Sequence, residues 1–157
     1  MVAVSAAADI RCVLIRAGAT QLLLPNATIS EVLSYSLPDP IAGAPAWLPG
    51  RLRWRGWRLP LVDFAALSGQ GDDAAGPGNK VVVLKALGGD PRLPYFALST
   101  QGFPRLVTVS VAQLRDADDA HAAPLPFAVR ARVQLGEESA QIPDLDALEG
   151  AVREVVD

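Results

Sequence analysis

The chain has 157 residues, of which half are hydrophobic and a fifth are charged, and its formal net charge is −3 at pH 7. This length and composition predict a globular domain that needs no disulfide bonds to fold, and they exclude a disordered chain. So small a net charge gives no general attraction to nucleic acid or to anionic lipid. The single cysteine, Cys12, excludes a disulfide framework and favours a reducing cytoplasm.

The apolar segments of the chain predict no direct membrane insertion. Residues 1–9 lack the basic start and the long apolar centre of a signal peptide. No apolar stretch approaches the roughly 20 residues that a membrane-spanning helix requires. We therefore expect a cytoplasmic protein that associates with a membrane only through a partner.

Thirteen prolines and thirteen glycines divide the sequence into short apolar segments, which are typical of β-strands between turns. The predicted strands cover residues 12–16, 21–24, 50–54, 57–62, 81–87, 95–99, 106–111, 128–135 and 139–142. Many short strands without alternating long helices indicate small barrels instead of a βαβ sheet.

Short helices are predicted at three places. Residues 26–33 can form one, because Asn26 is a suitable N-cap and the apolar residues at positions 29, 32 and 33 share a helical face, from which Glu31 points away. Asp63 can cap a single helical turn. Residues 144–155 predict a C-terminal helix with one apolar face.

The Gly- and Asp-rich residues 70–79 predict an exposed linker. Residues 63–69 (Asp-Phe-Ala-Ala-Leu-Ser-Gly) and 144–150 (Asp-Leu-Asp-Ala-Leu-Glu-Gly) are similar, and each follows a predicted hairpin. A match this short can arise by chance, but a true repeat would mean two related subdomains, each closed by a helical turn. The expected organisation is a single domain, residues 1–157, with a first β subdomain at 12–69, a second at 80–143 and a helix at 144–157.

The sequence offers little for catalysis, which needs a nucleophile beside a base, a proton-transfer group or a metal. His121 is the single histidine, and Cys12 is expected inside a strand as a small apolar side chain. Asp116, Asp118, Asp119 and His121 come nearest to a metal site, but their spacing does not match a calcium loop. We therefore predict no enzyme activity, no catalytic residue, no metal and no cofactor.

One stretch is chemically unusual: Arg-Leu-Arg-Trp-Arg-Gly-Trp-Arg, which begins at Arg51. In a strand, Leu52 and Trp54 share one face and Arg51 and Arg53 share the other, with Arg55 at the hairpin tip. Three interpretations stay open on composition alone. The arginines can be an ordinary solvent face, they can bind single-stranded nucleic acid together with the tryptophans, or they can form a protein–protein hot spot.

A longer pattern extends over residues 27–64. It contains Glu-Val-Leu from Glu31, Pro-Ala-Trp-Leu-Pro-Gly up to Gly50, Arg-Gly from Arg55 and Pro-Leu-Val-Asp-Phe from Pro60. In order and spacing, this pattern resembles the CheW family of chemotaxis coupling proteins. In the second half, residues 86–89 and 95–105 look more like the ChpC branch, which accompanies the chemosensory system of type IV pili and twitching motility.

The resemblance implies an all-β fold with short helices, made of two five-stranded SH3-like barrels around a shared apolar seam. It also implies a non-catalytic scaffold that bridges the regulatory domain of a CheA-type histidine kinase to the cytoplasmic tip of a methyl-accepting chemoreceptor, without nucleic acid. A small-barrel module for single-stranded nucleic acid is the alternative function, although the acidic net charge disfavours it.

The resemblance also implies which residues bind partners. Receptor contact is expected at Ile29 and Glu31 on the predicted helix and at Arg55. Arg53 stands where the family commonly has Asn, and an added positive charge there would change which partner is accepted. The residues expected to be structural are Gly50, Gly56, Pro60 and Asp63.

Overall fold

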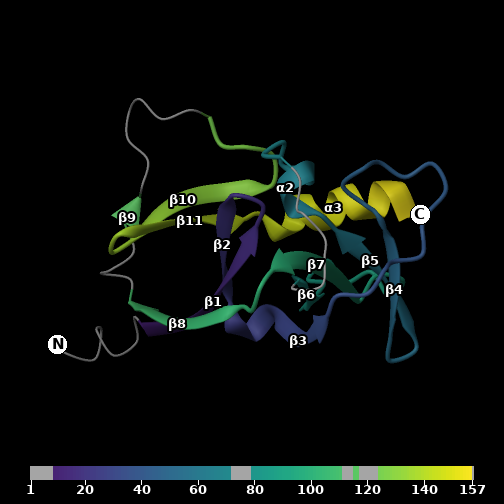
Figure 1. The fold of residues 1–157 in the computed structure, drawn as a ribbon, viewed down its shortest axis with the longest axis horizontal. Helices are drawn as coiled ribbons and strands as arrows, with labels where there is room; N and C mark the ends of the chain where they lie inside the picture. Colours follow the sequence, from purple (N-terminus) through teal and green to yellow (C-terminus); the bar gives the residue numbers. More distant parts are fainter. Residues whose placement is uncertain (1–8, 72–78, 111–114, 117–123, 157) are drawn as a thin grey trace.

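The computed structural model describes residues 9–71, 79–110, 115–116 and 124–156, in which two β-sheets lie beside each other along the longest axis of the molecule (Figure 1). The strands are β1 (Asp9–Ala17), β2 (Thr20–Pro25), β3 (Ile29–Ser34), β4 (Gly50–Trp54), β5 (Trp57–Val62), β6 (Asn79–Lys85), β7 (Tyr95–Gln101), β8 (Arg105–Ser110), β9 (Arg115–Asp116), β10 (Val129–Leu135) and β11 (Glu138–Pro143). The helices are the 3-10 helix η1 (Asn26–Thr28), the single turn α2 (Phe64–Leu67) and α3 (Leu145–Val156). Of the helices in these ranges, none is both long and apolar enough to cross a membrane.

Within the described residues, hydrogen bonding joins the strands into a first sheet of six, in the order β8-β1-β2-β11-β10-β9, and a second sheet of five, in the order β3-β6-β7-β5-β4. The prediction of an all-β fold with short helices and two five-stranded units is confirmed, and the two-residue strand β9 adds a sixth member to the first sheet. Strands β4 and β5 begin and end at the predicted residues.

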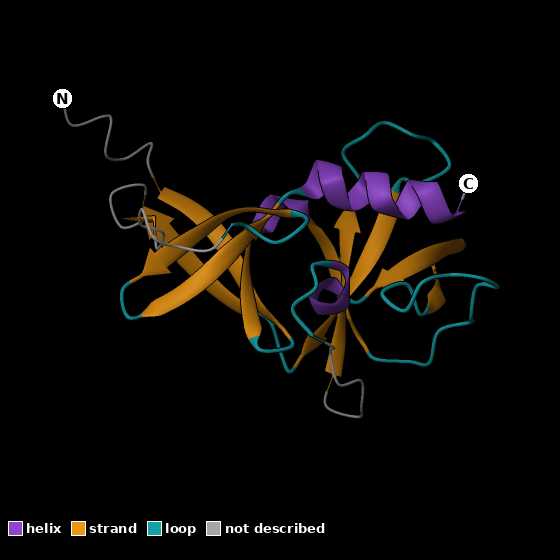
Figure 2. Ribbon diagram, turned by 90° about the horizontal axis from the view of Figure 1, so that it is seen from above, coloured by secondary structure: helices purple, strands orange, loops and turns teal. Residues whose placement is uncertain are grey.

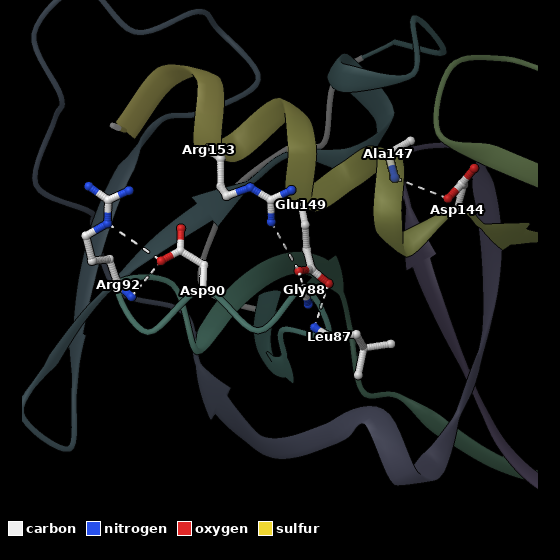
Figure 3. Close-up of polar contacts among 8 residues, drawn as sticks. All are labelled: Leu87, Gly88, Asp90, Arg92, Asp144, Ala147, Glu149 and Arg153. Carbon is white, nitrogen blue, oxygen red and sulfur yellow. Dashed lines mark hydrogen bonds and ion pairs between the residues drawn. The ribbon is translucent and has the colours of Figure 1, made fainter.

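Two helices begin with the same cap. The Asp63 Oδ1 atom accepts a hydrogen bond from the backbone N of Ala66 at 3.2 Å, and the Asp144 Oδ1 atom accepts one from the backbone N of Ala147 at 3.1 Å (Figure 3). These bonds satisfy donors that the first turn of a helix leaves without a partner. The predicted helical turn after Asp63 and the predicted C-terminal helix are therefore confirmed.

The predicted helix at residues 26–33 is wrong. Only Asn26–Thr28 forms a helical turn, η1, and the chain then enters strand β3, which pairs with β6. A β-bulge lies between Ile29 and Glu31, so Ile29 shares a face with Val32, three residues away. This spacing imitates the period of a helix, and the sequence pattern alone does not distinguish the two.

The predicted division into subdomains at residues 12–69 and 80–143 does not match the sheets. Strands β1 and β2 join β8, β10 and β11, whereas β6 and β7 join β3, β4 and β5. Both sheets nevertheless follow one plan. An edge strand pairs with an antiparallel hairpin, the second strand of this hairpin pairs with a parallel strand, and that strand has an antiparallel partner. The repeat is thus real in the structure, but the N-terminal hairpin completes the C-terminal unit.

A shared apolar core joins the two sheets. It contains Val13 and Leu22 from the first sheet, Val82 and Phe96 from the second, and Leu148 from α3, all buried. One face of the β1–β2 hairpin and one face of the β6–β7 hairpin supply these side chains, so each sheet covers the other and apolar area is removed from water.

Polar contacts complete the junction between the sheets. The buried Thr100 hydroxyl of β7 donates to the carbonyl oxygen of Arg16 at 2.9 Å and accepts from its backbone N at 3.1 Å. On α3, which runs along the second sheet (Figure 2), Glu149 is only 1% exposed. Its carboxylate accepts from the backbone N atoms of Leu87 (2.7 Å) and Gly88 (2.8 Å), as Figure 3 shows. Helix α3 follows β11 of the first sheet, so these two hydrogen bonds connect the helix to the β6–β7 loop of the second sheet.

Candidate functional site

The β4–β5 hairpin turns through Arg55 and Gly56, whose φ angles are +48° and +82°. Two positive φ angles are typical of the two-residue turn that matches the twist of adjacent strands. Glycine adopts this conformation freely, whereas a residue with a Cβ atom is strained in it by about 1 kcal/mol. Arg55 is therefore an unfavourable residue for the backbone conformation that it occupies.

Three side chains meet at this tip. The Glu31 Oε1 atom accepts a hydrogen bond from Trp54 Nε1 at 2.9 Å and lies 3.0 Å from Arg55 Nη2. The guanidinium carbon of Arg55 lies 5.1 Å from the centre of the Trp54 ring, within the range of a cation–π contact. The Arg55 side chain is 70% exposed, so the cluster holds a guanidinium in a defined place at the surface.

The curvature of the second sheet brings these residues together. Strands β3 and β4 are its opposite edges, yet Glu31 of β3 contacts Trp54 and Arg55. Leu33 of β3 packs against the buried clusters that contain Leu52 and Trp54, so side chains close the sheet into a barrel-like unit. Inside it, the Trp54 ring meets the Tyr95 ring edge to face at 4.9 Å, which fixes the indole and its N–H donor.

The outer face of the hairpin carries more positive charge. Arg53 and Arg58 are exposed and stand directly opposite each other in the β4–β5 register. Trp57, which is 42% exposed, pairs with Trp54 and starts from the other face of the hairpin. Residues 53–58 line a hollow of about 430 Å³. The pairing of β5 with β7 reaches only Leu61 and Val62, so this tip extends beyond the end of β7.

The predicted partner-binding residues do not all form one surface. The structure brings Glu31 and Arg55 into contact and places Arg53 on the same hairpin. Ile29 lies apart from these residues: the bulge turns it to the opposite face of β3, where it packs against the shared core. In a regular strand Ile29 and Glu31, two residues apart, would share one face, and the bulge places them on opposite faces.

The residues expected to be structural have clear local roles. A Cβ atom on Gly50 would overlap the backbone carbonyl of Asp39, which forms an antiparallel bridge with Arg51 where the loop between β3 and β4, residues 35–49, runs beside β4. Gly56 occupies the second turn position, and Pro60 is buried opposite Arg51. Asp63, as described above, caps α2.

Sequence reasoning did not single out Arg58 or Trp57 as site residues, nor the bond from Trp54 to Glu31. The signal was present, because a strand period of two places Arg53 and Arg58 on one face once the turn is known. The bond to Glu31 had no such signal, since it joins opposite edges of a sheet.

The groups considered for catalysis have other surroundings. Cys12 is buried in an apolar cluster with Leu14 and Val109, and burial raises the pKa of its thiol. His121, Asp118 and Asp119 lie outside the described residues, and of Asp116 only the backbone is described. In the ranges that the structure covers, no three His, Cys, Asp or Glu side chains are grouped as metal ligands.

Two β-sheets around a shared core define an all-β class of protein, and the comparisons with known proteins identify its family. Residues 11–152 match the model of the CheW-like domain, so this chain belongs to the CheW-like domain family. The structure is similar to that of the scaffolding protein TtCheW from Thermoanaerobacter tengcongensis, with a TM-score of 0.70 and 14% sequence identity. The match covers 85% of this chain and 88% of that one. No curated protein sequence matches the chain.

Proposed function

We propose that this protein is a non-catalytic adaptor that couples the cytoplasmic tip of a methyl-accepting chemoreceptor to the regulatory domain of a CheA-type histidine kinase. Membership of the CheW-like domain family supports a role as a chemotaxis coupling scaffold. In this proposal the protein acts in the cytoplasm, is recruited to membrane receptor arrays by its partners, and uses Glu31, Arg53 and Arg55 for partner contact.

The single observation that carries the proposal is the strained and exposed Arg55. Glycine would relieve the strain of a positive φ angle, and the equivalent hairpin of the first sheet has Gly136, with φ +63°, in its turn. Glu31 and Trp54 instead hold an arginine there, with most of its side chain in solvent. Strain that is maintained by surrounding contacts is typical of functional positions.

The test is Arg55→Glu, with Arg92→Glu as the matched control. Both arginines are exposed and paired with a carboxylate, but Arg92 pairs with Asp90 in the β6–β7 loop. Arg55→Glu should weaken binding of the kinase regulatory domain or of a receptor fragment by about 2 kcal/mol or more, about 30-fold. Because the lost pair is exposed, the free energy of unfolding should change by only about 0.5–1 kcal/mol.

Isothermal titration calorimetry with each purified partner measures the binding, and urea denaturation measures the stability. Unchanged binding by Arg55→Glu, or an equal loss with Arg92→Glu, would contradict a specific contact at the hairpin tip. If the wild-type protein binds neither partner, the adaptor function itself is wrong.

We also propose that the pathway is the type IV pilus system, on the resemblance of residues 86–89 and 95–105 to the ChpC branch. A strain that lacks the protein should then lose twitching motility and keep flagellar swimming. Restoration of twitching by the wild-type gene, and not by Arg55→Glu, would link the pathway to the hairpin tip. Loss of swimming with normal twitching would place the protein in the flagellar pathway instead.

Binding of single-stranded nucleic acid is the second candidate, because arginines and tryptophans alternate at the tip. Bases need exposed aromatic rings for stacking. The Trp54 ring is buried against Tyr95, which leaves Trp57 as the exposed ring of this hairpin. The geometry therefore favours the adaptor function.

A further inference from the structure

The outer face of the β4–β5 hairpin contains an unfavourable arrangement of charge. Arg53 and Arg58 are directly opposed in the antiparallel register, where side chains on one face start only about 5 Å apart. Like charges at this distance destabilise a sheet. Arg55, at the adjacent turn, is a third guanidinium within six residues.

No carboxylate in the described ranges forms an ion pair with Arg53 or Arg58. The carboxylate that lies closest to the tip, Glu31, is already engaged by Trp54 and Arg55. The chain as a whole is acidic, with a net charge of −3, so a surplus of arginine at this one tip is not a general property of its surface.

The equivalent hairpin of the first sheet, β10–β11, has uncharged residues at these two positions. Aligned on their capping residues, Asp63 and Asp144, the β4–β5 and β10–β11 hairpins have the same cross-strand register. The pair equivalent to Arg53 and Arg58 is Gln134 and Ser139, both uncharged. The fold therefore does not require the arginine pair, and its presence points to a ligand that neutralises it.

The chemistry of the pair selects the ligand. Each guanidinium can donate two parallel hydrogen bonds to one carboxylate, and a carboxylate between two arginines turns their repulsion into attraction. Trp57 pairs with Trp54 and so starts from the other face of the hairpin. It is 42% exposed, however, and lines the same hollow at the tip as the two arginines, where it offers an apolar surface to a side chain next to the acidic ones. A nucleic acid would find few cations on an acidic protein and one exposed ring for stacking.

We propose that Arg53 and Arg58 form a carboxylate-binding pair that receives an acidic segment of the partner protein, with an apolar side chain of that segment against Trp57. This inference deepens the proposed function, because it names the chemistry of the partner at the same hairpin. It predicts that the pair lowers the stability of the free protein and raises the affinity for the partner.

The test transfers the neutral pair of the first sheet to the second: Arg53→Gln together with Arg58→Ser. Loss of like-charge repulsion should raise the thermal midpoint by about 1–3 °C. Affinity for the kinase domain or the receptor fragment, whichever the wild-type protein binds, should fall at least about tenfold. Arg92→Gln, which removes one exposed charge elsewhere, should leave the affinity unchanged.

Unchanged affinity in the double variant would overturn the inference and leave the adaptor function intact. A lower thermal midpoint would also overturn it, because the arginines would then be structural. A separate measurement uses fluorescein-labelled peptides in which glutamates, or in the control peptide glutamines, flank one leucine. The protein should bind the glutamate peptide alone, with an affinity that falls as salt is added. Equal binding of both peptides, or tighter binding of a single-stranded thymidine oligonucleotide, would refute the proposal. This measurement does not need the kinase domain or the receptor fragment, so it tests the arginine pair even if the adaptor function is wrong.

Discussion

The two hairpins that follow one plan, β4–β5 and β10–β11, lie toward opposite ends of the molecule (Figure 1). Both have a two-residue turn, the same register, a final strand parallel to a neighbouring one, and a capped helix. Their tips differ in charge and in strain: the second sheet presents Arg53, Arg55 and Arg58 where the first has Gln134, Gly136 and Ser139.

An ion pair joins each hairpin to the edge strand of its sheet, and the positions of the positive and the negative side chain are exchanged between the two sheets. In the second sheet, a carboxylate on β3, Glu31, contacts the tip residue Arg55. In the first sheet, an arginine on β8, Arg105, contacts Glu138 at the start of β11. Both sheets thus have an ion pair between edge strand and hairpin, and the sign of the charge at the hairpin differs. What is particular to β4–β5 is the surplus of arginine, and we connect that surplus with binding.

The largest expected effect is on stability, and it distinguishes equivalent positions near the start of β4 and β10. Gly50 and Ala131 are equivalent, but a Cβ atom at Gly50 would overlap the carbonyl group of Asp39. Gly50→Ala should therefore lower the free energy of unfolding by about 2–3 kcal/mol, since backbone must move. Ala131→Gly should lower the free energy of unfolding by only about 0.5–1 kcal/mol. Urea denaturation of both variants measures the difference, and equal losses would show that the loop at residues 35–49 moves aside without a cost in stability.

A smaller effect is expected at the turns. Gly136→Ala places a Cβ atom at a φ angle of +63° and should destabilise the protein by about 1 kcal/mol. Arg55→Ala at the equivalent position should cost about 0.5 kcal/mol or less, because the strain is already present and the lost pair is exposed. Thermal unfolding of both variants tests this order. A larger loss for Arg55→Ala would mean that the arginine supports the fold more than the binding surface.

The smallest effect concerns the pH dependence of the first hairpin. The hydrogen bond from Arg105, followed by the one from Gln21, lowers the pKa of Glu138. A carboxyl group with a lowered pKa stabilises the folded state above its ordinary pKa, and this contribution is lost as the pH falls through the folded-state pKa. Wild type should therefore lose slightly more thermal stability than Glu138→Gln between neutral and acidic pH. Parallel acid titration curves would show that the pair contributes nothing.

Local sequence patterns were sufficient for much of the fold. The β4 and β5 strands, their Arg-Gly turn and the capped helices follow from signals within a few residues: alternation, turn chemistry and an Asp at the N-cap. The Arg/Trp stretch was recognisable as the unusual surface for the same reason. The repeat of the helical caps also pointed correctly to two related units.

Only the tertiary structure decided the rest. The bulge in β3 places Ile29 against the shared core and Glu31 on the other face of the strand, and it depends on the pairing with β6, which no local pattern encodes. Likewise, β1 and β2 complete the C-terminal unit because buried faces select their partners across long distances in the chain. The contact of Glu31 with Trp54 and Arg55 arises in the same way, from the curvature that closes the sheet.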